Sequence, residues 1–271
     1  MNKIKQYIKR LLNIIKEPEM KILPGQLAFF LFLSLVPIIT LVVYFGLIFS
    51  VGTDSISVLV NKIFPIEISN LLKPYVNDIG IDFNTIIFMI TGFIVASNGP
   101  NSLIITSNTL YKIKQDNYIK GRIKALFMTI LLIVLFIFTL IVLAFGDKIM
   151  LFISNISLLK NIGDKLILIY SLLKWPLALF IIYFIVKILY TWSPSKNIPS
   201  KYMKRGAIFT TIMWCIVSMI YSFYINNYAN YNLFYGSLAN IVVIMIWVYA
   251  LSYILVIGMI INNEHYIKEN G

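Results

Sequence analysis

Long stretches without a charged side chain are the feature that most constrains the fold of this chain. None occurs from Leu27 to Val51, and none lies between Arg205 and Glu264. A helix needs about 20 apolar residues to cross about 30 Å of hydrocarbon. The 271 residues are 59% hydrophobic, which is more apolar side chain than a water-soluble domain of this size can bury. The sequence therefore excludes a soluble globule and predicts an all-α, polytopic membrane helix bundle.

Six transmembrane helices are predicted from the apolar runs, of which the one at 170–192 carries Lys174 and Lys187 near its ends, where long side chains can reach the head groups. The asparagine-rich segment 226–232 divides the last run, which is too long for one crossing, into two. The expected spans are residues 27–51, 83–105, 125–146, 170–192, 206–225 and 238–261. In terms of domains, we expect a cytoplasmic interfacial segment at 1–24, a transmembrane domain at 25–263 and a short cytoplasmic tail at 264–271.

The distribution of the basic residues predicts the orientation. Lys and Arg number 23 against 11 Asp and Glu. Six lie in 1–24, five in 106–124 and four in 193–205, whereas the alternate loops contain few. Because cytoplasmic loops carry the excess of Lys and Arg, both termini are expected in the cytoplasm. This arrangement accounts for most of the positive charge, so no nucleic-acid partner is predicted.

Two segments outside the spans have an amphipathic helical pattern. Apolar residues recur at helical spacing through residues 4–15, with lysine and arginine on the other faces. This pattern predicts an interfacial helix held by apolar insertion and by anionic lipid heads, acting either as a plain anchor or in lipid sensing. Pro24 and Gly25 are expected to turn the chain into the first span. The loop 52–82 predicts two short amphipathic helices on the outer face.

Polar residues interrupt the second span near Pro100. Proline removes a backbone donor and clashes with the preceding turn, so a kinked or discontinuous helix is predicted. The break either lines a substrate or ion path, as broken helices of transporters do, or is a kink satisfied by neighbouring helices. In the first span, Ser34 or a neighbouring hydroxyl is expected to satisfy the carbonyl freed by Pro37. The candidate cavity or substrate-path residues are Ser34, Pro37, Ser97, Asn98, Gly99, Pro100, Asn101, Asn108, Tyr111, Ser218, Ser222, Tyr235, Gly236, Ser237, Trp247 and Tyr249.

Residues that commonly carry catalysis are few. Cys215 is the single cysteine and His265 the single histidine, and the eleven acids are scattered over loops on both sides. Phosphodiester cleavage needs a general acid and base, or a metal held by clustered ligands. We therefore expect no catalytic residue, no cofactor and no metal, and we do not expect an enzyme.

Several short motifs resemble those of a known membrane protein family. They are Leu27–Phe30 with Leu33–Pro37, Asn108 with Tyr111, Leu189-Tyr190 with Ser193-Pro194, Gly206-Ala207 with Trp214, Tyr235–Leu238 with Trp247–Tyr249, and Gly258 with Asn262. The chain thus resembles the YihY/BrkB (virulence factor BrkB) family, formerly described as ribonuclease BN. The resemblance implies a six-helix protein of the bacterial cytoplasmic membrane, with envelope lipid or polysaccharide export suggested for some relatives. Similar sequences commonly carry Glu two residues after the last-helix glycine, where this chain has Ile260.

Two functional hypotheses follow. The leading one is a transporter or flippase-like exporter of an envelope lipid or other amphipathic compound. The alternative is a noncatalytic membrane scaffold or assembly factor for envelope proteins. Expected partners are membrane lipids, anionic ones among them, with a homo-oligomer or other membrane proteins left open. Since no acid, arginine or histidine is expected at the membrane centre, a proton relay is disfavoured.

Overall fold

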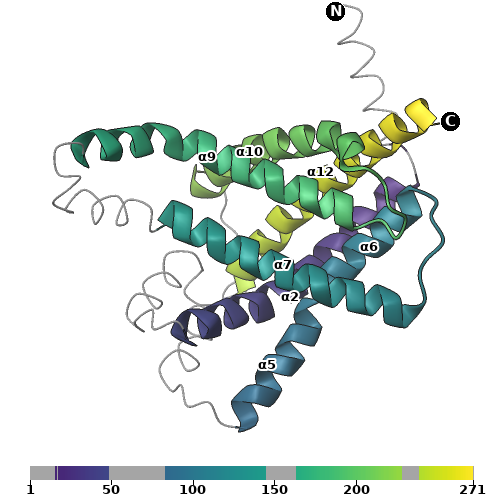
Figure 1. Cartoon of the computed structure of the whole chain (residues 1–271), viewed down its shortest axis with the longest axis horizontal. Coiled ribbons are helices and arrows are strands. Elements are labelled where there is room, and N and C mark those ends of the chain that lie inside the picture. The colour runs from purple at the N-terminus through teal and green to yellow at the C-terminus, as the bar shows by residue number, and fades with distance from the viewer. Residues whose placement is uncertain (1–15, 17, 49–82, 145–162, 228–237, 271) are drawn as a thin grey trace, which may run out of the picture.

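The computed structural model describes residues 16, 18–48, 83–144, 163–227 and 238–270, and within them every regular element is a helix. This confirms the all-α class for the described residues. The elements, shown in Figure 1, are α2 (Glu19–Ile48), α5 (Phe83–Ala96), α6 (Asn98–Leu110), α7 (Tyr118–Ala144), α9 (Gly163–Trp192), the short 3-10 helix η1 (Ser200–Met203), α10 (Lys204–Asn227) and α12 (Ala239–Asn270).

Several of these helices are long and apolar enough to cross a membrane. Among the described residues, the segments that meet this condition are Tyr118–Thr139, Ser171–Trp192, Ser200–Ile225 and Ile241–Glu269. The second predicted span is divided between α5 and α6. The helices predicted within 4–15 and 52–82 lie outside the described residues, and so do Tyr235, Gly236 and Ser237.

The main hydrophobic core lies at one end of the bundle, which we call the core end. Its buried side chains come from the first half of α2, α7 and α10, from the middle and end of α6, from the second half of α9 and α12, and from the segment with η1 between α9 and α10. Examples from these six helices are Leu27, Met128, Ala207, Ile104, Tyr190 and Val256. These helices therefore alternate in direction along the chain. The beginning of α2 and the end of α12 lie at the same end of the molecule (Figure 1).

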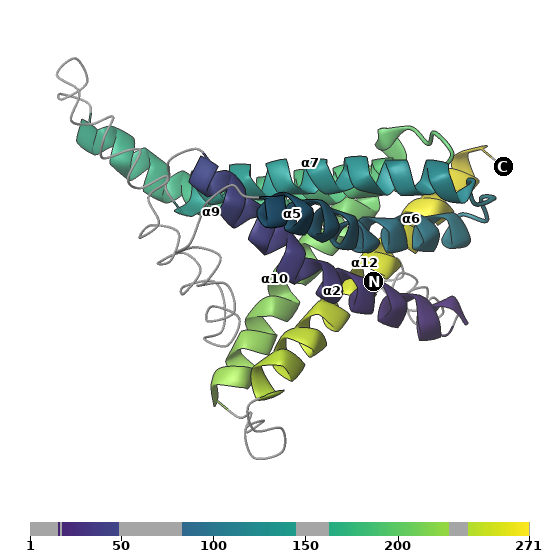
Figure 2. The same ribbon diagram turned by 90° about the horizontal axis from the view of Figure 1, so that it is seen from below.

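The halves of the helices far from the core end expose large apolar side chains. Leu172 and Trp175 of α9 are exposed, as are Met219 and Phe223 of α10. Figure 2 shows α10 and the first half of α12 leaning away from α7 and α9. Large apolar side chains exposed over contiguous surface mark a contact with lipid or with another protein. The chain therefore presents extensive apolar surface outside its core.

The turn expected at Pro24 and Gly25 is wrong, because α2 runs without interruption from Glu19. The missing N–H of Pro24 costs the helix one hydrogen bond near its start. Met20 and Leu23 before this pair, and Leu27 after it, are all buried in the main core. Packing on both sides therefore keeps the segment helical. At the other end, α12 continues through Asn270, so the predicted tail is helical as far as that residue.

A close helix crossing brings α10 against α12. The Gly206 N–H donates to Oδ1 of Asn262 at 2.7 Å, and a Cβ at Gly206 would collide with the carbonyl oxygen of Gly258. A Cβ at Gly258 would in turn meet the hydroxyls of Tyr190 and Thr210. Gly206 and Gly258, which belong to the short motifs noted in the sequence, thus have a packing role. They let α9, α10 and α12 meet without side-chain overlap.

Candidate functional site

Ser97 separates α5 from α6, which confirms the predicted discontinuity of the second span. The Ser97 N–H donates to the Phe93 carbonyl at 3.1 Å, and the Asn101 N–H donates to the Ser97 carbonyl at 3.0 Å. Pro100 has no N–H to offer to the turn before it. The hydroxyl of Ser97 donates to the Ile94 carbonyl at 2.7 Å. The backbone ladder is therefore interrupted by about one turn, which we call the break.

Ser34 of α2 contacts the break directly. The Gly99 N–H donates to the Ser34 hydroxyl oxygen at 2.8 Å, and this hydroxyl donates to the Phe30 carbonyl at 2.7 Å. A Cβ at Gly99 would lie 2.9 Å from the Ser34 Oγ, so glycine permits the close approach. Of the two alternatives for the carbonyl freed by Pro37, which is that of Leu33, the structure contradicts Ser34 as the donor. A serine hydroxyl in a helix reaches the carbonyl four residues back, which here belongs to Phe30.

Arg122 of α7 bridges the two sides of the break. Its Nη1 donates to Oδ1 of Asn98 at 2.9 Å, and its Nη2 donates to the Ile94 carbonyl at 2.8 Å. The planar guanidinium can make both bonds at once, and its charge suits the negative end of α5. Sequence reasoning counted Arg122 only as a loop charge, because the span was expected to begin at Ala125, whereas α7 begins at Tyr118.

Lys124 makes a similar contact with the end of α9. Its Nζ donates to the carbonyl oxygens of Ser193 at 3.2 Å and of Pro194 at 2.6 Å. The last carbonyls of a helix have no partner within the helix, and cations near them are favourable. The first turns of α7 therefore carry two cations, Arg122 and Lys124, that satisfy the carboxyl ends of two other helices.

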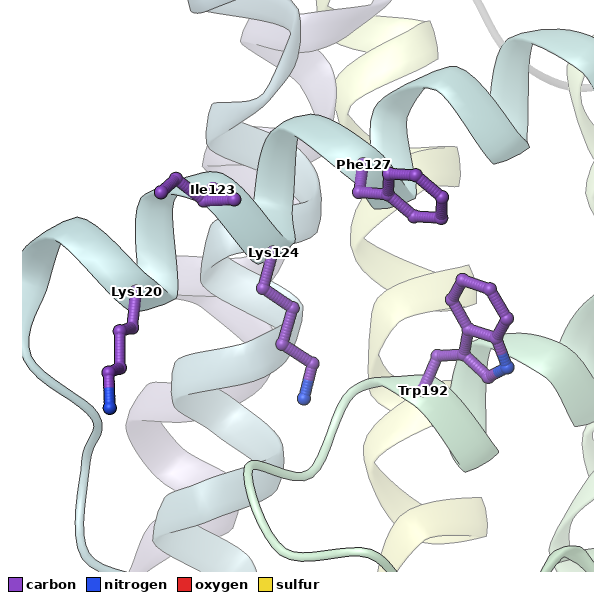
Figure 3. Close-up of a pocket in the computed structure, with 5 residues that line it drawn as sticks. All are labelled: Lys120, Ile123, Lys124, Phe127 and Trp192. Atoms are coloured by element: carbon purple, nitrogen blue, oxygen red, sulfur yellow. The ribbon is translucent and has the colours of Figure 1, made fainter.

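A groove beside Lys124 opens between α7 and α9. Its volume is about 410 Å³, and Lys120, Ile123, Phe127 and Trp192 line it with Lys124. Figure 3 shows the two lysines directed to one side of α7, and Phe127 facing Trp192. The two aromatic rings are stacked with their centroids 5.9 Å apart. The groove thus combines an apolar wall with an adjacent positive charge.

Asn108 and Tyr111 lie at the core end, away from the break. The fully buried Asn108 donates through Nδ2 to the Ser195 hydroxyl at 2.8 Å and to Gln115 Oε1 at 3.0 Å, and its Oδ1 accepts the Ser195 N–H at 2.8 Å. The Tyr111 hydroxyl donates to the Met203 sulfur at 3.6 Å. Both side chains tie the end of α6 to the chain that follows α9.

The remaining described candidates do not join either group. The Trp247 indole N–H donates to the Ser218 hydroxyl at 3.1 Å, which links α10 to α12. Ser222 and Tyr249 are exposed, and Pro37 is half-buried in α2. The structure therefore brings Ser34 and Ser97–Asn101 together at the break, and Asn108 and Tyr111 together at the core end. It does not unite the described candidates in one site.

Three buried hydroxyls on α6 were not proposed as site residues from the sequence. Ser102, Thr106 and Ser107 are shielded, and their side-chain oxygens have no hydrogen-bond partner within the described part of the chain. Ser102 and Thr106 are one turn apart on the helix. Buried polar groups are normally paired, so such a row calls for an explanation. The signal in the sequence is the polar, uncharged stretch that continues after Pro100.

The described residues contain no group of three or more His, Cys, Asp or Glu side chains that could hold a metal ion. His265 pairs through Nε2 with Oε1 of Glu269 at 2.9 Å, one turn along α12. Ile260, at the place where similar sequences carry Glu, is buried in the main core.

Long apolar helices, apolar outer faces and polar contacts between helices define a multi-pass membrane protein. The model of the family described as Virulence factor BrkB matches residues 15–270, and the chain belongs to this family.

Curated relatives agree with this membership. The chain is 25% identical over 242 residues to the ribonuclease-like protein YfkH of Bacillus subtilis (strain 168), a match that covers 88% of this chain and 87% of that protein. It is 30% identical over 76 residues to a UPF0761 membrane protein of Chromobacterium violaceum, covering 28% of this chain and 18% of the relative. A UPF0761 membrane protein of Alteromonas mediterranea is 36% identical over 70 residues, covering 26% and 24%. No solved structure matches the chain.

Proposed function

We propose that the chain is a six-span protein of the bacterial cytoplasmic membrane that moves an amphipathic envelope compound across it. The alternating directions of α2, α5–α6, α7, α9, α10 and α12 support six crossings. The lysines that follow α6 and α9 lie near the core end, where α2 begins and α12 ends. By the positive-inside rule, this end faces the cytoplasm, together with both termini.

The row of unpaired hydroxyls on α6 carries the proposal of transport. A buried hydroxyl without a partner costs about 1–3 kcal/mol, and the cost is not recovered from lipid. Ser102, Thr106 and Ser107 follow directly on a broken helix, in the segment that packs between α2 and α7. A sugar or phosphate group that passed along α6 would supply the missing hydrogen bonds. Broken helices serve polar substrates in this way in other transporters.

The test uses the purified protein in liposomes that contain a fluorescent phosphatidylglycerol analogue. We expect the wild type to move the probe between leaflets faster than protein-free liposomes do. The double variant Ser102→Ala with Thr106→Val is expected to slow this movement and to leave thermal stability equal or higher, because it removes hydroxyls that have no partner. If these hydroxyls were only structural, stability would fall instead.

Thr129→Val is the matched control. Thr129 is also a buried hydroxyl of a membrane helix, but it already donates to the Ala125 carbonyl at 2.8 Å. Its replacement should leave movement of the probe unchanged. Wild-type liposomes that move the probe no faster than empty ones would remove the support for transport of this lipid class.

A noncatalytic scaffold is the second candidate function. The contacts of Ser34 and Arg122 with the break favour it, because they satisfy the freed backbone groups without a substrate. If this function holds, the wild type itself would move the probe no faster than protein-free liposomes do, and the double variant on α6 would change which membrane proteins co-purify with the chain.

We also propose that the chain is not a nuclease, although the name of the Bacillus relative includes "ribonuclease-like". The imidazole of His265 is paired with Glu269, and the carboxylates of the described residues do not gather at one place. Incubation of the purified protein with RNA and Mg²⁺ or Mn²⁺ is expected to give no cleavage. Cleavage that His265→Ala abolishes would contradict this proposal.

A further inference from the structure

A second cavity, of about 310 Å³, lies at the core end, where three segments meet. Its walls come from the end of α6 with the residues after it, from the chain after α9, and from the last turns of α12. The polar and aromatic side chains that line it are Tyr111, Lys112, Lys114, Lys196, Asn263 and Tyr266. Three lysines therefore line one small cavity, and no acid is among its lining residues.

Lys112 adopts a backbone conformation that is costly for a lysine. The Lys112 N–H donates to the Thr109 carbonyl at 3.2 Å, and the Ile113 N–H donates to the Asn108 carbonyl at 2.8 Å. These two bonds form a Schellman motif, in which the left-handed position is usually glycine. Lys112 takes this position with φ of 53°, the one positive φ at a non-glycine residue in the described part of the chain. A strained residue that keeps a charge beside a cavity points to a role for that charge.

Hydrogen bonds between the segments hold the cavity open and in shape. Asn263 Nδ2 donates to the Leu110 carbonyl at 2.9 Å, which fixes α12 against the end of α6. The bonds of Asn108 with Ser195 fix the chain after α9 against the same end. The Lys196 ammonium lies 5.9 Å from the centroid of the Tyr266 ring, so a cation–π contact orients it. The ligand would therefore meet a largely preformed site.

The nearby acids do not neutralise the cavity. Asp116 is an exposed residue of the loop before α7. On α12, Glu269 is paired with His265, and Glu264 is half-buried but does not line the cavity. A compact group with negative charge and several acceptor oxygens is the chemistry that three lysines would bind. Basic pockets between membrane helices at the cytoplasmic side bind anionic lipid head groups in this way.

We propose that this cavity binds a phosphate group, presented either by the head group of an anionic phospholipid or by a soluble phosphate compound. Lys112, Lys114 and Lys196 supply the positive charge, and Asn263 and the tyrosines supply the polar lining. The proposal goes beyond transport, because such binding is an equilibrium property that a scaffold would share.

The test measures binding to the full-length protein in neutral detergent, with two probes. Native mass spectrometry follows phosphatidylglycerol against phosphatidylcholine, and calorimetry follows inorganic phosphate. Lys112→Gln combined with Lys196→Gln is expected to weaken binding by about fivefold for each lysine, or about 25-fold together. The control combines Lys204→Gln with Lys268→Gln, which removes the same charge from exposed residues that do not line the cavity. The affinity of this control variant for both probes should stay close to that of the wild type.

Lys112→Gly separates a binding role from a structural one. Glycine adopts the left-handed conformation without strain, so this variant should melt at the same or a higher temperature than the wild type. It should nevertheless bind the probe about fivefold more weakly. A lysine with only a structural role would not separate stability from binding in this direction.

The two probes distinguish the source of the phosphate. If the cavity variants lose phosphatidylglycerol binding selectively, and inorganic phosphate does not compete with this lipid in the wild type, the lipid head group is the source. Loss of inorganic phosphate binding, with no preference between the lipids, identifies a soluble compound. A wild type that binds neither probe would overturn the proposal, and so would cavity variants that bind like the control.

Discussion

The guanidinium of Arg122 on α7 lies 2.9 Å from the side-chain oxygen of Asn98, the first residue of α6. Its other nitrogen reaches the Ile94 carbonyl on the preceding helix. One side chain thus holds both sides of the break, and Ser34 holds the Gly99 N–H from α2. The angle between α5 and α6 is therefore set by α2 and α7, and not by Pro100 alone.

Removal of the Arg122 side chain should destabilise the protein. Arg122→Ala leaves the Ile94 carbonyl and the Asn98 side chain without this partner, and hydrogen bonds to a charged group are worth about 1.5–3 kcal/mol. Arg122→Lys should have a melting temperature between those of the wild type and Arg122→Ala, because an ammonium does not reproduce the planar geometry with which the guanidinium makes two hydrogen bonds. Thermal unfolding in detergent measures both. Lys120→Ala, an exposed lysine of the same helix, is the control, and equal melting of the two alanine variants would contradict the role given to Arg122.

An alanine at position 99 should push α6 away from α2. Its Cβ would lie 2.9 Å from the Ser34 Oγ and 3.1 Å from the Leu31 Cδ2, and such overpacking costs about 1–3 kcal/mol. Gly121→Ala provides a matched control, since nothing lies within 4 Å of its Cβ and alanine favours a helix. We expect Gly99→Ala to melt lower than the wild type and Gly121→Ala to melt at the same temperature or higher. The opposite order would refute the close contact with α2.

The crossing of α9, α10 and α12 should tolerate no side chain at Gly258. Gly258→Ala places a methyl group against the hydroxyls of Tyr190 and Thr210, so we expect a sharp loss of folded protein by size-exclusion chromatography. Tyr190→Phe removes one of these hydroxyls and should restore part of the folded fraction in the double variant. Additive losses in the double variant would show that the two residues do not interact.

Asn108 should contribute far more to stability than its partner Gln115. Asn108→Ala removes a fully buried amide that binds the N–H and the hydroxyl of the half-buried Ser195, at an expected cost of about 1–3 kcal/mol. Gln115 is exposed, so water can replace its contact, and Gln115→Ala should change the melting temperature little. Denaturation in detergent compares them directly. Similar melting temperatures would mean that the contact with Ser195 is not stabilising.

Much of the site followed from local chemistry in the sequence. The break was predictable because Pro100 lacks a backbone donor and stands among short polar residues, whereas Pro24, between buried apolar residues, does not interrupt α2. The role of Arg122 was not predictable. A basic residue near the start of a span gives the same sequence pattern whether its side chain faces lipid head groups or the end of another helix. Ser34 was a candidate path residue because it is polar within an apolar span, but its contact with the Gly99 N–H could not be predicted, because Gly99 is 65 residues away in the sequence.

The sequence by itself determined the class of this protein and the place of its irregular helix. Long apolar runs without charge predict helices that lie in lipid. Proline removes a backbone hydrogen bond within its own helical turn. Only the tertiary structure decided that α2 continues through Pro24, that Arg122 and Lys124 satisfy the ends of two helices, and that three lysines surround one cavity. These features depend on groups that are distant along the chain, and packing alone brings such groups within hydrogen-bonding distance.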